Sequence, residues 1–97
     1  MNIQIDQKDL EAFCRKNHVR KLALFGSVLR ADFNKASDVD VLVEFEPEHM
    51  PGLFAMARMQ RELSGLFKRN VDLRTPEDLS RYFRKEVVNT ADVRYAA

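Results

Sequence analysis

The chain has 97 residues, of which 45% are hydrophobic and 32% carry a charge. This composition is typical of a soluble globular domain and excludes a disordered chain, which would combine low hydrophobicity with a high net charge. Sixteen Lys and Arg against fifteen Asp and Glu give a net charge of +1, so no global charge predicts binding to nucleic acid or to an anionic membrane.

The single cysteine, Cys14, excludes an internal disulfide and a cysteine-based zinc site, and it fits a reducing compartment. The amino terminus lacks the apolar core of a signal peptide, and no apolar run approaches the ~20 residues of a membrane span. We therefore expect a cytoplasmic protein with one domain over residues 1–97.

The first third of the chain predicts a helix, a buried strand and a second, short helix. Asp6 has the side chain of a helix N-cap, so a helix is expected from about residue 7 to residue 17. The apolar run at 20–25 stops at Gly26, which is typical of a strand buried on both faces. The short helix is expected to begin at Ser27, directly after this glycine.

The remaining two thirds predict two strands and further helices. Apolar and acidic residues alternate over 38–45, which indicates a strand, and the two prolines of 46–51 indicate a loop. Apolar residues recur at spacings of three and four over 53–67, which predicts a helix with a buried face along its whole length. The chain then continues with a third strand at 70–74 and one or two short helices over 79–88. This order of helices and strands is that of an α/β layered domain.

Two aspartates stand out on the second predicted strand. Asp38 and Asp40 are two residues apart, so their side chains share one face, about 6.6 to 6.8 Å apart along the backbone. Ionised carboxylates about 4 Å apart repel each other by roughly 4 kcal/mol at an effective dielectric constant of about 20, and a divalent cation removes this repulsion. Oxygen ligands without His or Cys favour Mg²⁺, which binds carboxylates together with substrate phosphates. The pair therefore predicts a phosphate-bearing substrate.

The glycine that ends the first strand predicts where such a phosphate would bind. Gly26 allows the backbone to approach a ligand closely, and Ser27 adds a hydroxyl at the start of a helix. Asp72, on the third strand, would be a third carboxylate that orients or deprotonates an attacking hydroxyl. Without the aspartates, the Gly-Ser pair alone would be interpreted as a helix cap.

The spacing of these residues resembles a known family signature. The chain reads "GS" at 26–27, ten further residues, and "DVD" at 38–40, which is similar to the G-S-x10-D-x-D signature of the polymerase-beta-like nucleotidyltransferase superfamily. The "VDL" at 71–73 matches the position of that family's third aspartate. From about residue 18 to its end, the chain most resembles the minimal nucleotidyltransferase (MNT) antitoxins. This resemblance implies a two-layer α/β nucleotidyltransferase core, with a small mixed sheet packed against helices.

The resemblance also implies roles for the three aspartates. Asp38 and Asp40 would be Mg²⁺ ligands, and Asp72 would be the third catalytic carboxylate and a further metal ligand. ATP would be the substrate, and one Mg²⁺ would activate the nucleophile while another holds the triphosphate.

The residues around the Gly-Ser pair would bind the nucleotide. By the resemblance, Gly26 and Ser27 contact its phosphates, and Arg30 matches an arginine that is common after the pair. The charge of Arg30 could meet phosphate, or the helix could equally turn it to solvent. Ala31 stands where many relatives have glycine, a departure that concerns only the local shape of the loop.

The resemblance names a protein partner as well. MNT antitoxins pair with HEPN toxins, which are helical ribonucleases, and transfer AMP from ATP to a tyrosine of the toxin. Too few residues follow position 75 to form an acceptor domain like those of larger nucleotidyltransferases, so we expect the acceptor on another macromolecule. We therefore hypothesise that this protein is an antitoxin that inactivates a HEPN toxin by AMP transfer.

Other functions stay open at this point. The protein could neutralise the toxin by binding alone, although an unneeded carboxylate cluster would cost stability. Transfer to a small molecule or to RNA is a further alternative. The sequence has no strong basic stripe with interleaved aromatic residues, so direct nucleic-acid binding is not expected, and neither is membrane binding.

Some residues outside these motifs also have an interpretation. We interpret Cys14 as a buried structural residue and His18 and His49 as surface or loop residues. Phe54 lies off the apolar face of its helix, which makes it a candidate contact for a partner.

Overall fold

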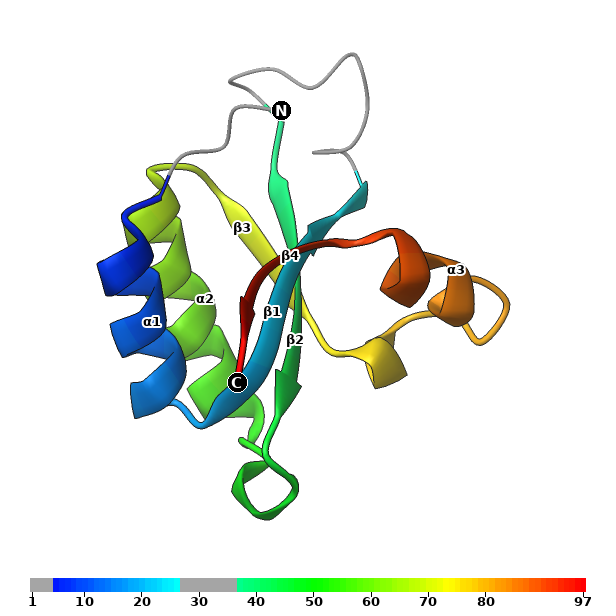
Figure 1. Cartoon of the computed structure of the whole chain (residues 1–97), viewed down its shortest axis with the longest axis horizontal. Helices are drawn as coiled ribbons and strands as arrows, with labels where there is room; N and C mark the ends of the chain where they lie inside the picture. The colour runs from blue at the N-terminus through cyan, green and yellow to red at the C-terminus, as the bar shows by residue number, and fades with distance from the viewer. Residues whose placement is uncertain (1–4, 27–36) are drawn as a thin grey trace.

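The centre of the structure is a sheet of four strands, β1 (Val19–Phe25), β2 (Val39–Phe45), β3 (Val71–Arg74) and β4 (Asp92–Ala96). The structure is a computed structural model that describes residues 5–26 and 37–97. The strand order is β3-β2-β1-β4 (Figure 1). β1 is antiparallel to both β2 and β4, whereas β2 and β3 are parallel. The sheet is therefore mixed, as the sequence led us to expect.

Two helices, α1 (Gln7–Lys16) and α2 (Leu53–Phe67), pack on one face of this sheet (Figure 1). They confirm the helices predicted at 7–17 and 53–67. The short helix α3 (Arg84–Thr90) lies on the other side, and two 3₁₀ turns, η2 (Pro47–His49) and η3 (Pro76–Asp78), follow β2 and β3. Within the described ranges, no helix has the length and apolar character needed to cross a membrane.

The apolar core lies between the sheet and these two helices. Every second residue of β2, from Val39 to Phe45, is buried in this core. Because side chains alternate along a strand, Asp40 and Glu44 lie on the opposite face. Each buried side chain of this size contributes about 1.5–3 kcal/mol to folding. The helices supply Leu10, Phe13, Cys14, Met59, Leu63 and Phe67.

The buried face of α2 is shorter than the sequence predicted. Met59 and Leu63 are buried, but the side chain of Leu53 is 84% exposed, so the expectation of a buried face along the whole helix was wrong at its first residue. An α-helix turns by about 100° per residue, which places Leu53 roughly 90° from the centre of the buried face. Phe54 is 90% exposed, in agreement with its position off that face.

The carboxyl-terminal strand was not predicted. Short helices were expected over 79–88, and the structure has α3 at Arg84–Thr90. Residues 92–96 form the edge strand β4, which pairs with β1. The backbone N–H of Ala97 also donates to the carbonyl of Arg20 at 2.9 Å. This strand forms by pairing with a distant segment, and local sequence is a weak guide to such pairing.

Cys14 is fully buried in α1, as predicted. Burial raises the pKa of its thiol to about 12, and the nearby negative charge of Glu11 acts in the same direction. Because the thiolate is the reactive form of cysteine, this thiol is inert at neutral pH.

Candidate active site

Asp40 and Asp72 lie side by side on neighbouring parallel strands. They are paired residues in the register of β2 and β3, whose strands are about 4.8 Å apart in a sheet of this kind. Their strand neighbours Val39 and Val71 are buried in the core beneath α1 and α2. Since alternate residues point to opposite faces, both aspartates lie on the face that these helices leave uncovered.

Asp38 is placed one residue before β2 rather than inside it. The strand begins at Val39, whose N–H donates to the carbonyl of Asn70 at 2.8 Å where β2 and β3 come together. The predicted strand over 38–45 therefore started one residue early. Asp38 is exposed, whereas Asp40 is half-buried, so the two carboxylates differ in their access to solvent.

Gly26 lies against the carboxylate of Asp40. It follows Phe25, the residue of β1 that pairs with Asp40 across the sheet. Its φ is +68°, a left-handed conformation that favours glycine, and a Cβ at this position would collide with Asp40 Oδ2. The fold thus places Gly26, the first residue of the Gly-Ser pair, beside Asp40, the second aspartate of the "DVD" motif. Ser27, Arg30 and Ala31 lie outside the described residues.

Asp72 has a partner that the sequence analysis did not identify. Arg74 Nε donates to Asp72 Oδ2 at 3.1 Å, and the two side chains are 47% and 40% exposed. The signal was present in the sequence, because residues two apart on a strand share a face. An ion pair this exposed contributes roughly 0–1 kcal/mol, so a stronger cation or a substrate could displace the arginine.

The three aspartates carry carboxylate oxygens, but among the described residues they do not form a group whose ligand atoms all lie within 4.8 Å of one another. Asp38 is exposed and the other two are half-buried, so solvent reaches all three side chains. Hard cations such as Mg²⁺ prefer oxygen ligands and keep several waters, so they need only one or two protein carboxylates. The Asp40 carboxylate occupies the space into which a Cβ on Gly26 would project, so the glycine permits the close approach of this carboxylate to the backbone.

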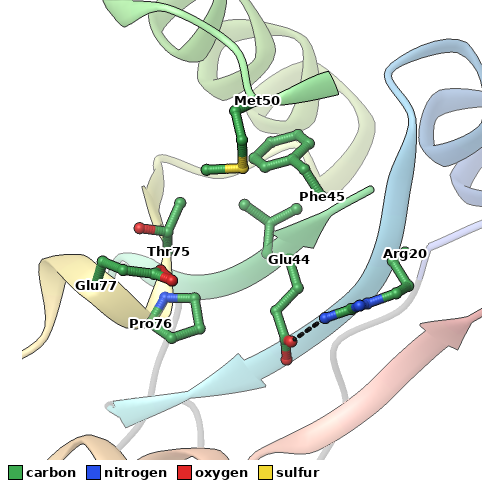
Figure 2. Close-up of a pocket in the computed structure, with 8 residues that line it drawn as sticks. Arg20, Glu44, Phe45, Met50, Thr75, Pro76 and Glu77 are labelled. Atoms are coloured by element: carbon green, nitrogen blue, oxygen red, sulfur yellow. Dashed lines mark hydrogen bonds and ion pairs between the residues drawn. The ribbon is translucent and has the colours of Figure 1, made fainter. Parts of the chain in front are cut away.

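A separate pocket with a volume of about 160 Å³ lies nearer the other end of β2 (Figure 2). Arg20 and Glu44 form an ion pair of 3.0 Å at its edge, and η3 supplies Pro76 and Glu77. Sites for small molecules usually have about 300 Å³ or more, so this pocket is too small for a nucleotide. It also contains none of the three aspartates.

Comparison with known proteins identifies the family. The nucleotidyltransferase domain family matches residues 7–93. The chain belongs to this family. Among curated proteins, the protein adenylyltransferase MntA of Thermococcus cleftensis is 34% identical over 70 residues, which cover 72% of this chain and 69% of that protein.

Solved structures have the same fold. The crystal structure of a toxin-antitoxin with AMP-PNP superposes with a TM-score of 0.74 at 19% identity, over 96% of this chain and 75% of that chain. The complex of a tri-AMPylated Shewanella oneidensis HEPN toxin with its MNT antitoxin gives a TM-score of 0.66 at 19% identity, over 94% and 70%. At this identity the likeness shows the fold, which is the minimal nucleotidyltransferase architecture expected from the sequence.

Proposed function

We propose that this protein is an antitoxin adenylyltransferase that transfers AMP from ATP to a tyrosine of a partner HEPN ribonuclease toxin and so inactivates it. The observation that carries the proposal is the pairing of Asp40 with Asp72, together with Gly26 against the Asp40 carboxylate. The 34% identical relative is named a protein adenylyltransferase, and the HEPN toxin in the complex of the same fold is AMPylated.

We propose that Asp38, Asp40 and Asp72 hold Mg²⁺ when ATP is bound. Their oxygen donors suit this cation, and their exposure leaves room for its waters. Bound Mg²⁺ would neutralise charge on the triphosphate and on the leaving pyrophosphate. A cytoplasmic location would supply both ATP and Mg²⁺.

In the proposed reaction, the tyrosine oxygen attacks the α-phosphorus of ATP. The new bond joins that oxygen to the α-phosphorus, and the bond between the α-phosphorus and the bridging oxygen breaks, so pyrophosphate leaves. Asp72 orients the tyrosine hydroxyl and accepts its proton. Arg74, 3.1 Å from Asp72 Oδ2, holds this carboxylate in place before substrate binds.

The nucleotide would extend from the aspartates toward Gly26. The glycine has no side chain to displace the Asp40 carboxylate, and it holds a left-handed backbone conformation directly after β1. Ser27 would add a hydroxyl contact to phosphate, and Arg30 a positive charge. The Ser27 contact follows from the sequence signature, whereas Arg30 matches an arginine that is common after the Gly-Ser pair and could equally face solvent.

Intact-mass spectrometry tests the proposal. The protein is incubated with the product of its neighbouring gene, ATP and Mg²⁺, and this candidate partner is then weighed. We expect added mass in whole AMP units, and none with the double variant Asp38→Asn, Asp40→Asn. An unchanged mass in a stable complex would instead favour neutralisation by binding alone.

A further inference from the structure

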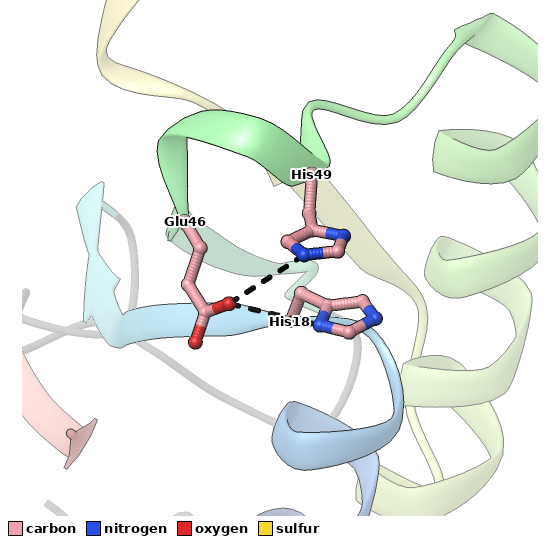
Figure 3. A group of neighbouring side chains, drawn as sticks. All are labelled: His18, Glu46 and His49. Carbon is pink, nitrogen blue, oxygen red and sulfur yellow. Dashed lines mark ion pairs between the residues drawn. The ribbon is translucent and has the colours of Figure 1, made fainter.

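Three exposed side chains gather near the end of β2 that lies away from Asp40. His18 stands in the turn between α1 and β1, Glu46 directly follows β2, and His49 ends η2 (Figure 3). Asp40 and Glu46 are six residues apart along a strand, which corresponds to about 20 Å. This cluster is therefore separate from the proposed nucleotide site.

The cluster presents two imidazole nitrogens and one carboxylate oxygen to a common space. Glu46 Oε2 lies 3.7 Å from His18 Nδ1 and 4.0 Å from His49 Nε2, and one ligand atom of each residue lies within 4.8 Å of the others. The two separations are too long for hydrogen bonds. The imidazole rings are stacked, with centroids 3.7 Å apart and planes 7° from parallel.

Backbone contacts fix the three positions relative to one another. The N–H of Glu46 donates to the carbonyl of His18 at 3.0 Å, and the N–H of His49 donates to the carbonyl of Glu46 at 2.9 Å. His18 has a φ of +57°, a left-handed conformation that directs the chain from α1 into β1. In a 3₁₀ turn, residues three apart lie on the same side, which aligns Glu46 with His49.

We propose that His18, Glu46 and His49 form a Zn²⁺ site with one open coordination position. Two histidines and one glutamate are an established ligand set for zinc, and water completes the tetrahedron. With metal–ligand bonds of about 2.0–2.2 Å, the donor atoms around tetrahedral zinc are about 3.4 Å apart. The three ligand atoms, which lie within 4.8 Å of one another, would therefore have to approach by up to about 1.4 Å. Rotation of one ring out of the stack would turn its nitrogen toward a metal bound by the other two residues.

The exposure of the side chains permits this rotation. The side chains of His18, Glu46 and His49 are 48%, 50% and 43% exposed, so none is held by core packing. Competing soft ligands are few, since the chain has no other histidine and its one cysteine, Cys14, is buried and protonated. The site thus binds zinc without participation of the aspartates.

NMR of the imidazole groups tests the proposal directly. Untagged protein is titrated with ZnCl₂ at neutral pH, and the two histidines give the only imidazole signals of the chain. We expect both sets of signals to shift together and to stop changing at one equivalent of zinc. Unchanged signals up to millimolar zinc, or a shift of one histidine alone, would overturn the proposal.

Matched variants separate this site from the aspartates and from non-specific binding. Glu46→Gln should weaken zinc binding at least tenfold, whereas Glu48→Gln, inside the 3₁₀ turn whose N-cap is Glu46, should leave it unchanged. The double variant Asp38→Asn, Asp40→Asn should also retain zinc binding. Equal effects of the two glutamate changes, or loss of binding with the aspartate changes, would contradict the assignment. All these positions are exposed or half-buried, and circular dichroism verifies that each variant folds.

Discussion

Asp40 and Asp72 are 32 positions apart in the chain, yet they are direct neighbours across the parallel pair of β2 and β3. The crossover through α2 makes this possible, because parallel strands need a long connection that returns to the same end of the sheet. The helix thus has two roles. It buries the apolar face of the sheet and brings the two carboxylates together on the other face.

Replacement of Asp72 tests its role as the base. We expect Asp72→Asn to lower the rate of AMP transfer by about 10²–10⁴-fold, the usual contribution of proton transfer by a positioned side chain. The measurement is the initial rate of transfer to the partner at saturating ATP. The midpoint of urea unfolding should change little, because the carboxylate is 40% exposed.

Asp92→Asn is the matched control for this prediction. Asp92 accepts from Arg94 Nε at 2.9 Å, the same arrangement two residues apart on a strand, but on β4 rather than β3. Transfer by the control should stay close to that of the unaltered protein. Equal losses in the two variants would argue that breaking an Arg–Asp pair, and not loss of the base, slows the reaction.

Gly26→Ala tests the close contact beside Asp40. The left-handed φ costs roughly 1–2 kcal/mol for a residue with a Cβ, and the collision with Asp40 Oδ2 adds to it. We therefore expect a lower free energy of unfolding and impaired transfer. Gly65→Ala, in α2, should instead stabilise the protein by about 0.5–1 kcal/mol, since its Cβ would meet nothing within 4 Å apart from the adjacent residues and backbone of its own helix. Urea unfolding of both variants checks that the free energy of unfolding falls in the first variant and rises in the second.

The α2 helix offers a second matched pair. Leu63 is fully buried against the sheet, so Leu63→Ala should cost about 2–5 kcal/mol. Leu53→Ala, on the same helix, should change the free energy of unfolding by less than about 0.5 kcal/mol because that side chain is 84% exposed. Similar losses at the two positions would show that the first turn of α2 is packed.

The buried thiol predicts a specific pH dependence. The pKa of Cys14 is raised from 9.0 to about 12, so the folded protein retains this proton while the unfolded chain loses it. The contribution of the Cys14 thiol to the free energy of unfolding is fully present below about pH 9 and declines as the pH rises toward 12. We expect Cys14→Ala to show a smaller decline over this range in urea unfolding. A decline of the same size in both proteins would contradict the shift.

The local patterns of the sequence predicted the elements that depend on local forces. Asp6 caps α1 as expected, with its carboxylate accepting from the N–H groups of Lys8 and Asp9. The alternation in β2 placed the valines in the core and Asp40 on the opposite face. Gly26 and the aspartates were found because the signature has a fixed spacing along the chain.

Features that depend on distant segments were not predicted. β4 forms only because β1 provides an open edge, and its five residues carry little pattern of their own. The stacked histidines are 31 positions apart, so nothing local to His18 or His49 indicates their contact. Both histidines were correctly expected at the surface. Their position beside Glu46 could not be predicted, because it depends on how the chain folds.

Transfer of a phosphate label tests the central claim most directly. The protein, the proposed HEPN partner and Mg²⁺ are incubated in parallel with ATP labelled at the α-phosphate or at the γ-phosphate. We expect labelled partner only with the α-label, and none when Asp38 and Asp40 are both replaced by asparagine. Label from the γ-phosphate, α-label that persists in the double variant, or a bound partner that acquires no label would contradict this claim.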